Sequence, residues 1–505
     1  MSQTPVLIPA LLLLSALFSL LFGLRSARLG HLVAVLGVLG SFLTAVAGAF
    51  GVITGGEAIR YAMGGWIPPI GIELVLDHLS VFMTLLITFI GLVVIVYAPR
   101  SLHFEAPGKA AFAWPAIVLL LAGLSGVSLT GDLFNLYVFL EISALAAYAL
   151  LAIGGKAAPV ATLRYLIVGA AGGGFYLLGV GFLYFTAGTV NMADLASRLP
   201  ELVENRAVVS AALLLVLGLA LKMALFPMHF WLPDVYTHAP SAVSGMIAPI
   251  MTKVSAYAII RLFLDVFPPG YFTEALPIAS TIGWLSAAGI VYGSVLAVAQ
   301  HDYRRMLAYS SVGQIAYVGL GIGLANPIGL IGGLLHMVNH ALMKSVLFLI
   351  GGAIRLRTGV TRIPDMKGLG RSMPWTMATF AIAALAMVGI PPTAGFFSKW
   401  YLLLGTIEAG NAWWFGVILI SSLLSGVYFF RVVEMIYRDP AVDPAEREEA
   451  DAAGRERPPL QPGGEPPASL LGPILILGVA ILAVGIFNVL IVGALLTHAV
   501  APLGG

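Results

Sequence analysis

The chain contains no cysteine, and this absence removes several kinds of chemistry at once. Iron–sulfur clusters, thiolate metal sites, disulfides and a cysteine nucleophile all need a sulfur atom that is not there. No glycine-rich phosphate loop follows a strand, and the HExxH motif does not occur. His336 and His340 could still hold a haem, but they lie four residues apart on one expected helix, and ligands in bundles usually come from several helices. We therefore expect no metal and no cofactor, and any electron transfer in another subunit.

Charge is also scarce. Only 10% of the 505 residues are Asp, Glu, Lys or Arg, whereas 59% are hydrophobic and the mean hydropathy is +0.98. This composition excludes an ordinary soluble fold. The formal net charge of +2 gives no sign of nucleic-acid binding. We expect a lipid bilayer to be the environment of most of the chain.

Long apolar runs fill the sequence. A scan for runs of about 18 or more residues gives about fourteen candidate spans. They lie near residues 5–24, 31–55, 76–98, 112–130, 131–153, 163–186, 207–226, 241–264, 276–299, 306–325, 328–352, 374–403, 412–436 and 469–495. Runs of this length satisfy their backbone groups in lipid only as helices, so we expect an all-α polytopic membrane protein. The first run has no basic residue before it, which favours a retained helix over a secretory signal.

The basic residues are unevenly distributed between the loops. The loops after odd-numbered spans hold Arg25, Arg28, Arg100, Lys109, Lys156, Arg164, Arg304, Arg305 and the cluster from Arg355 to Arg371. The opposite loops hold little more than Arg60, Arg198, Arg206 and Arg261. Loops rich in Lys and Arg stay in the cytoplasm. We therefore expect a multi-pass protein of the cell inner (plasma) membrane with both termini on the outer face.

One segment breaks the apolar pattern. Residues 439–468 are charged and rich in proline and glycine, which predicts a solvated linker before a last helix within 469–505.

A carboxylate lies inside the run GDLFNLYVFLEISALAAYALLA, where Glu141 stands near mid-span after Asp132 and Asn135. An ionised group at the bilayer centre costs roughly 2.5–3.5 kcal/mol on insertion scales, so such residues normally face a bundle interior or a hydrated path. A structural hydrogen bond between helices is the alternative, although a neutral Gln would provide it at lower cost. We interpret Glu141 as a group whose protonation follows the movement of a partner charge.

Two lysines flank a proline-rich stretch. Lys222 is followed by Pro227, Pro233 and Pro240, and Lys253 lies twelve residues into the next span. Proline removes a backbone hydrogen bond and clashes with the preceding turn, so we expect a broken helix here. Unwound backbone at membrane depth is typical of ion-handling sites in transporters. Lys222 could instead extend to the membrane interface, which is less plausible for Lys253.

A polar stripe follows in the second half. His336, His340 and Lys344 are spaced i, i+4, i+8 and therefore share one helical face. Histidine titrates near neutrality and can pass protons in either direction, although a single buried histidine is as often a core residue. Lys399 comes directly after a second helix-breaking cluster, GIPPTAG at 389–395. These residues extend the set of titratable groups inside apolar runs.

Taken together, these motifs resemble the antiporter-like membrane subunits shared by Mrp-type sodium/proton antiporters, respiratory complex I and membrane-bound hydrogenases. The resemblance covers about residues 70–435 and rests on LFNLYVFLEIS, FWLPD, APS, TKVSAYAIIR, HDYRRMLAYSSVGQIAYV, the HxxxHxxxK stripe and GIPPTAGFFSK. It implies two inverted five-helix repeats, each with a broken helix, at 111–265 and 275–438. Helices 1–3 would occupy 1–110, and helix 14 would lie in 469–505.

The resemblance also implies roles for individual residues. Glu141 and Lys222 would form an ion pair, Lys253 would bridge, the stripe would connect the two halves, and Lys399 would lie at the exit. Protons would move along this row halfway through the bilayer. The implied site residues are Glu141, Lys222, Lys253, His336, His340, Lys344 and Lys399.

Two functions remain open. The overall length and the residues flanking Glu141 are most similar to the D subunit of Mrp antiporters, which exchange sodium for protons. The run His229, Asp234 and His238 is closer to relatives from redox complexes, in which this chain would pump protons or sodium without holding the redox centre. Tyr303 stands where many relatives have a basic residue. A scaffold without transport would leave the buried charges without a role. In both main interpretations the partners are other membrane subunits of a hetero-oligomeric complex.

Overall fold

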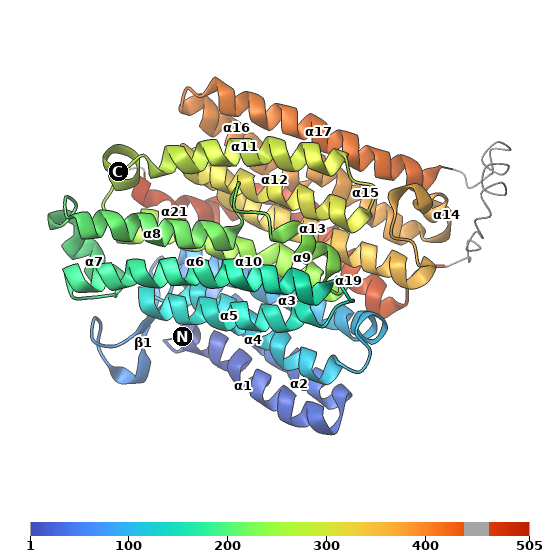
Figure 1. Cartoon of the computed structure of the whole chain (residues 1–505). Helices are drawn as coiled ribbons and strands as arrows, with labels where there is room; N and C mark the ends of the chain where they lie inside the picture. The colour runs from blue at the N-terminus through green and yellow to red at the C-terminus, as the bar shows by residue number, and fades with distance from the viewer. Residues whose placement is uncertain (1, 439–463, 504–505) are drawn as a thin grey trace.

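The structure is a computed structural model that describes residues 2–438 and 464–503. Its long helices run side by side in one elongated bundle (Figure 1). Thirteen helices among the described residues are long and apolar enough to cross a membrane. The expected all-α polytopic fold is therefore confirmed.

The elements follow one another with short connections. The first half contains α1 (Thr4–Arg25), α2 (Ala27–Gly55), β1 (Ile59–Ala62), β2 (Glu73–Leu76), α3 (His78–Glu105), α4 (Ala110–Leu129), α5 (Leu133–Ala152), α6 (Ala158–Ala187), α7 (Met192–Arg198), α8 (Arg206–Met223), α9 (Leu232–His238) and α10 (Ser241–Arg261). The second half contains α11 (Ile278–Val298), α12 (Tyr303–Leu324), α13 (Pro327–Thr358), α14 (Leu369–Ser372), α15 (Pro374–Val388), α16 (Ala394–Glu408), α17 (Ala412–Tyr437), α19 (Ala468–Ile486), α20 (Asn488–Ile491) and α21 (Thr497–Ala499).

Three helices form the centre of the bundle. In α10, α12 and α13, 89–94% of the most apolar window is buried by other helices, against 33–39% in α1 and α2. The helices at the centre are closely packed. A Cβ added at Gly321 of α12 would lie only 2.7 Å from the Cα of Gly333 of α13. Polar side chains on these central helices are therefore kept away from lipid, which lowers the cost of their presence.

Two helices are broken, as the proline positions predict. Lys222 lies in the last turn of α8, which ends in a left-handed residue, Ala224 (φ 61°), before the seven-residue α9. The predicted single span 374–403 is instead two fifteen-residue helices, α15 and α16, separated at Gly389 (φ 93°). Both breaks lie next to a lysine of the predicted row. The division of the chain into two five-helix repeats remains a prediction.

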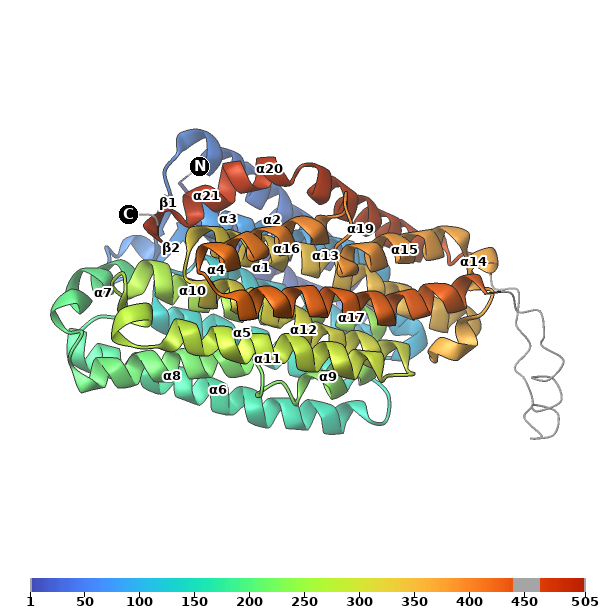
Figure 2. The same ribbon diagram turned by 90° about the horizontal axis from the view of Figure 1, so that it is seen from above.

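The C-terminal segment differs from a single tethered helix. The predicted span 469–495 ends as a regular α-helix at Ile486, and α20 and α21 continue after a break at Phe487. Figure 2 shows these three helices following one another along one face of the bundle. Because α19 contacts α3, α13 and α15, it is part of the bundle. The predicted linker 439–468 falls mostly outside the described residues.

One end of the bundle carries a feature that the hydropathy pattern did not indicate. The strands β1 and β2 form an antiparallel hairpin in which Ile59 pairs with Leu76 and Ala62 with Glu73. Both chain termini lie at this same end (Figures 1 and 2). The common position of the termini agrees with an even number of crossings.

Candidate functional site

The first predicted pair is formed. Lys222 of α8 donates a hydrogen bond to Glu141 of α5, with Nζ 2.8 Å from Oε1. The lysine side chain is 7% exposed and the carboxylate side chain 27% exposed. The helix break after Lys222 leaves this amine at the end of α8 instead of inside a continuous helix. Lys222 therefore does not extend to the interface but points to the carboxylate.

A glycine on α6 makes room for this pair. A Cβ placed on Gly173 would lie only 2.4 Å from Oε1 of Glu141. The neighbouring Gly172 would place a Cβ 3.5 Å from Cγ of Lys222. The carboxylate therefore occupies the space that any other side chain at 173 would need.

Lys253 lies on the central helix α10 and is fully buried. Its amine donates a hydrogen bond to the backbone carbonyl of Ala248 at 2.7 Å. Pro249 lies inside the same helix and cannot donate to the carbonyl of Gly245, which instead accepts a hydrogen bond from Ser345 of α13 at 2.8 Å. This contact ties α10 to the helix that carries the polar stripe.

The stripe on α13 is buried along its whole length. Nζ of Lys344 donates to the carbonyl of Leu307 at 2.7 Å and to the hydroxyl of Ser310, both on α12. The ring nitrogens of His336 lie 2.9 Å from Oγ of Ser398 and 3.0 Å from Oε1 of Gln314. The imidazole of His336 is thus held between α12 and α16.

His340 differs from its neighbour. Its ring stacks on that of His336, with the centroids 5.9 Å apart. Neither of its ring nitrogens has a hydrogen-bond partner among the residues that the structure describes, although the side chain is fully buried. Lys253 is close enough to interact electrostatically with both histidines and with Lys344. His340 therefore presents free donor and acceptor positions near Lys253, Lys344 and a second histidine.

Lys399 occupies the second helix break. Its amine donates to the carbonyls of Met387 and Val388, each at 3.0 Å, and to the hydroxyl of Ser422 at 3.2 Å. The two carbonyls lie in the last turn of α15, where helical partners are missing. The ring of Tyr317 lies 5.3 Å from this amine and 5.2 Å from the imidazole of His336, so it joins the stripe to Lys399.

Three other polar residues noted in the sequence have contacts outside the row of lysines and histidines. Asp132 is the N-cap of α5 and accepts a hydrogen bond from the backbone N–H of Asn135 at 2.7 Å. Burial raises the pKa of Asp132, and backbone hydrogen bonds partly oppose this. Asp234 pairs with Arg164 at 2.9 Å, and Tyr303 donates to a backbone carbonyl of α13.

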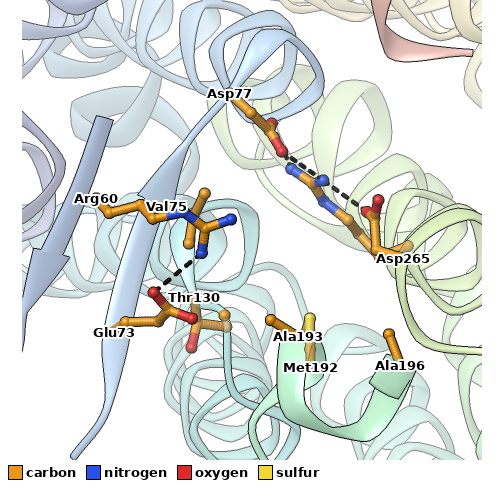
Figure 3. A pocket seen from close by; sticks show the side chains of 11 residues that line it. Arg60, Glu73, Val75, Asp77, Thr130, Met192, Ala193, Ala196 and Asp265 are labelled. Atoms are coloured by element: carbon orange, nitrogen blue, oxygen red, sulfur yellow. Dashed lines mark hydrogen bonds and ion pairs between the residues drawn. The ribbon is translucent and has the colours of Figure 1, made fainter. Parts of the chain in front are cut away.

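A separate polar pocket opens at the end of the bundle that carries the hairpin (Figure 3). Its volume is about 320 Å³, and it is lined by Arg60, Glu73, Val75, Asp77, Thr130, Gly131, Met192, Ala193, Ala196, Arg261 and Asp265. The guanidinium of Arg261 contacts Asp77 at 2.6 Å and Asp265 at 2.7 Å. Burial alone would raise the pKa of Asp77, but Arg261 and the hydrogen bonds from Ser80 lower it to about 2.

Comparisons with known families agree with this arrangement. The model described as "NADH:quinone oxidoreductase/Mrp antiporter, TM" matches residues 130–425, which include all seven predicted site residues. The model described as "NADH-Ubiquinone oxidoreductase (complex I), chain 5 N-terminus" matches residues 66–113. The chain belongs to the NADH:quinone oxidoreductase/Mrp antiporter family of membrane subunits.

Individual relatives come from both branches of this family. The chain is 46% identical over 504 residues to "NADH-quinone oxidoreductase subunit N" of Desulforudis audaxviator, covering 98% of this chain and 97% of the relative. It is 33% identical over 410 residues to the D subunit of a Na(+)/H(+) antiporter from Alkalihalophilus pseudofirmus, covering 81% and 80%. The sequence resemblance to antiporter-like subunits is confirmed, whereas the narrower assignment to the D subunit of Mrp antiporters is not.

Solved structures show the same fold inside larger assemblies. A chain of the membrane-bound sulfane sulfur reductase, an archaeal respiratory membrane complex, superposes with a TM-score of 0.88 at 29% identity, covering 99% of this chain and 98% of that one. A chain of the Mrp complex from Dietzia sp. DQ12-45-1b gives a TM-score of 0.86 at 28% identity, covering 99% and 97%. This family member therefore works with other membrane subunits.

The charged residues of this family member can be found from the sequence, but their neutral partners are harder to find. Gln314 and Ser398, which hold His336, lie inside the motifs quoted above, and the motifs alone do not distinguish them. A polar residue within an apolar run, which Gln314 is, would have been the signal. Tyr317 and Gly173 give no comparable signal, because an aromatic residue and a glycine are common in membrane helices.

Proposed function

We propose that this chain moves protons through the membrane along the row Glu141, Lys222, Lys253, His340, His336 and Lys399, with Lys344 beside it. The observation that carries this proposal is the ion pair at the first helix break, where a buried amine meets a carboxylate inside the bundle. Three further buried lysines continue from this pair toward the second break.

The partners of these amines support the proposal. Among the described residues, Lys253, Lys344 and Lys399 donate to carbonyl and hydroxyl oxygens and form no ion pair with a carboxylate. A buried amine with only neutral acceptors can release and regain a proton without leaving an unpaired anion behind. Histidine between such amines provides sites that accept and donate protons in turn.

The Glu141–Lys222 pair would control the row. At 2.8 Å and an effective dielectric of 20, the attraction between the two charges is about 6 kcal/mol. This is an upper figure, because the carboxylate is 27% exposed and partly screened. Separation of the pair would withdraw a stabilising charge from the lysine, and each 1.4 kcal/mol changes its proton affinity about tenfold. Opening and closing of the pair would therefore drive proton release and uptake.

Two kinds of complex could contain this chain, a redox complex and an Mrp-type antiporter. The 46% identity to a protein named for an NADH-quinone oxidoreductase extends over nearly the whole of both chains, whereas the identity to the D subunit of an antiporter is 33% over about four fifths. We favour a redox complex whose electron-transferring centres lie in other subunits. A sodium/proton antiporter of the Mrp type is the second candidate, favoured by the antiporter relative. We also propose a plasma-membrane location with both termini outside, on the basis of the loop arginines and lysines.

A transport assay on the assembled complex tests the proton route. Inverted vesicles containing the complex would be followed with a pH-sensitive dye after addition of an electron donor or a sodium pulse. Lys222→Ala and Glu141→Gln should each abolish acidification while the complex still assembles. Lys156→Ala is the matched control, because this lysine is exposed in a loop of the same half. Normal acidification by Lys222→Ala would refute the route.

The same vesicles distinguish the two complexes. Proton movement that needs an electron donor and continues without sodium would indicate a redox pump. Proton movement that starts on a sodium pulse without any donor would indicate an antiporter. Identification of the co-purifying subunits would give an independent answer.

A further inference from the structure

Helix α3 lies beside the central helix α10 and runs in the opposite direction. Its N-terminal end meets the C-terminal end of α10, where Asp77 binds Arg261. Its C-terminal end meets the N-terminal end of α10, where Glu105 binds Ser241. An α-helix of 21 residues is about 30 Å long, so the two contacts are separated by roughly the thickness of the hydrocarbon core. Each end of α10 is therefore tied to α3 by an acid of α3.

The tie at the pocket end is a forked ion pair. Oδ1 of Asp77 accepts from Nη2 of Arg261 at 2.6 Å, and Oδ2 accepts from Nη1 at 2.7 Å. Asp265 binds the same guanidinium at 2.7 Å, and Figure 3 draws the contacts of Asp77 and Asp265 as dashed lines. The Nε–H of Arg261 donates to the hydroxyl of Tyr257 at 2.7 Å. Bidentate arginine–carboxylate pairs fix orientation as well as distance, so this contact sets the rotation of α10 at one end.

The tie at the other end uses the helix terminus itself. Glu105 accepts a hydrogen bond from the backbone N–H of Ser241 and a second, at 2.7 Å, from the Ser241 hydroxyl. One turn earlier on α3, the hydroxyl of Ser101 accepts from the backbone N–H of Ala242 at 3.2 Å. A carboxylate at a helix N-terminus satisfies unpaired N–H groups and the helix dipole together. Arg355 of α13 approaches the same carboxylate at 3.7 Å.

Between the two ties lies Lys253. It is twelve residues after Ser241 and eight before Arg261. Pro249 removes one internal hydrogen bond of α10 in the same stretch, which makes the helix easier to bend there. An external support that holds both ends therefore limits how far Lys253 can shift along or around the axis.

We propose that α3 is a two-ended clamp for α10 and that Asp77 and Glu105 are positioning residues for Lys253. The inference rests on the proposed function, because the position of Lys253 affects transport only if protons pass through this lysine. The two carboxylates do not touch the row. They hold α10, and with it the central lysine, in a fixed position relative to His340 and Lys344 on α13.

The test compares two clamp variants with a matched control. Asp77→Asn and Glu105→Gln each remove the negative charge and one of the two acceptor oxygens from one tie. Asp265→Asn removes a carboxylate from the same guanidinium, but this residue lies just beyond α10 on the same segment, and among the described residues its ion pair is with Arg261 of α10 itself. The initial rate of proton transport by the assembled complex, normalised to the amount of complex in the vesicles, would be measured across pH.

Each clamp variant should lower the rate about tenfold, as expected for loss of a hydrogen bond to a charged group. It should also move the pH of half-maximal transport by about half a unit or more, because Lys253 would lie differently among His336, His340 and Lys344. Asp265→Asn should keep the rate and the pH profile of the unaltered complex. Loss of complex without a change in the profile of what remains would overturn the clamp, since it would show a role in assembly alone.

Three further outcomes distinguish failure of the clamp from failure of the proposed function. Equal effects of Asp77→Asn and Asp265→Asn would show that charge at the pocket matters, and the tie between helices would be refuted. Lys253→Ala completes the set. If it stops transport while the clamp variants behave as Asp265→Asn does, the clamp alone is wrong. If Lys253→Ala transports normally, the proton row through Lys253 is wrong and the clamp falls with it.

Discussion

Replacement of Gly173 by alanine should separate Glu141 from Lys222 without touching either residue. The added Cβ would lie 2.4 Å from Oε1 and 3.3 Å from the carboxyl carbon of Glu141. Carbon atoms that are not bonded normally stay about 3.5–4.0 Å apart, so the carboxylate would have to retreat by about 1 Å or rotate away. A retreat of about 1 Å lengthens the 2.8 Å contact to Lys222 beyond hydrogen-bond distance.

The expected loss follows from this contact. A hydrogen bond between charged groups is worth about 1.5–3 kcal/mol, which corresponds to roughly tenfold to a hundredfold. Gly174→Ala is the control, because a Cβ there has nothing within 4 Å and the position is exposed. Both variants gain about 1 kcal/mol of helix propensity, so this gain cancels in the comparison.

The assay is the initial rate of dye-detected proton transport in vesicles, normalised to assembled complex. We expect Gly173→Ala to fall to between about a tenth and a hundredth of the normal rate, with Gly174→Ala unchanged. Equal rates for the two alanine variants would refute the reasoning, because the pair would then be irrelevant or able to reform. A fall in both would point to the outer surface of α6 and away from the carboxylate.

The remaining predictions concern the pocket end and the orientation of the chain. The pKa of Asp77 is lowered from 3.8 to about 2, so its ionised form adds about 2.5 kcal/mol of stability that is fully present above pH 3.8 and is lost as pH falls toward 2. The thermal unfolding midpoint of Asp77→Asn should therefore lie below that of the unaltered chain at pH 5, and the two should converge near pH 2; a constant difference would contradict this assignment. Because the chain has no cysteine, Glu57→Cys should react with an impermeant maleimide from outside intact cells, whereas Lys156→Cys should not, and the opposite pattern would reverse the topology.

The sequence predicts the helices well because membrane helices depend on local hydrophobicity. The two breaks were also predictable, since proline and glycine act on their own backbone. The partners of the stripe were harder to predict, because Gln314 and Ser398 come from other helices, 22 and 62 residues away from His336. The role of Gly173 depends on the neighbouring helix α5, and a single sequence does not show which helices touch. The ties of α3 to α10 could not be predicted for the same reason, although Asp77 lies at the start of a predicted span and Glu105 lies after its end.

The two helix breaks surround their lysines with different electrostatic partners. Lys399 is held there by two carbonyl dipoles and a hydroxyl, whereas Lys222 is held by a full negative charge. Two lysines at opposite breaks therefore sit in unequal electrostatic wells. On the proposed row, a positive charge would be drawn to the Glu141 side whenever that carboxylate is free, and this attraction would be largely cancelled while Lys222 neutralises it. The asymmetry of the two breaks would therefore bias the position of a charge inside the bundle, and a single ion pair would switch this bias on and off.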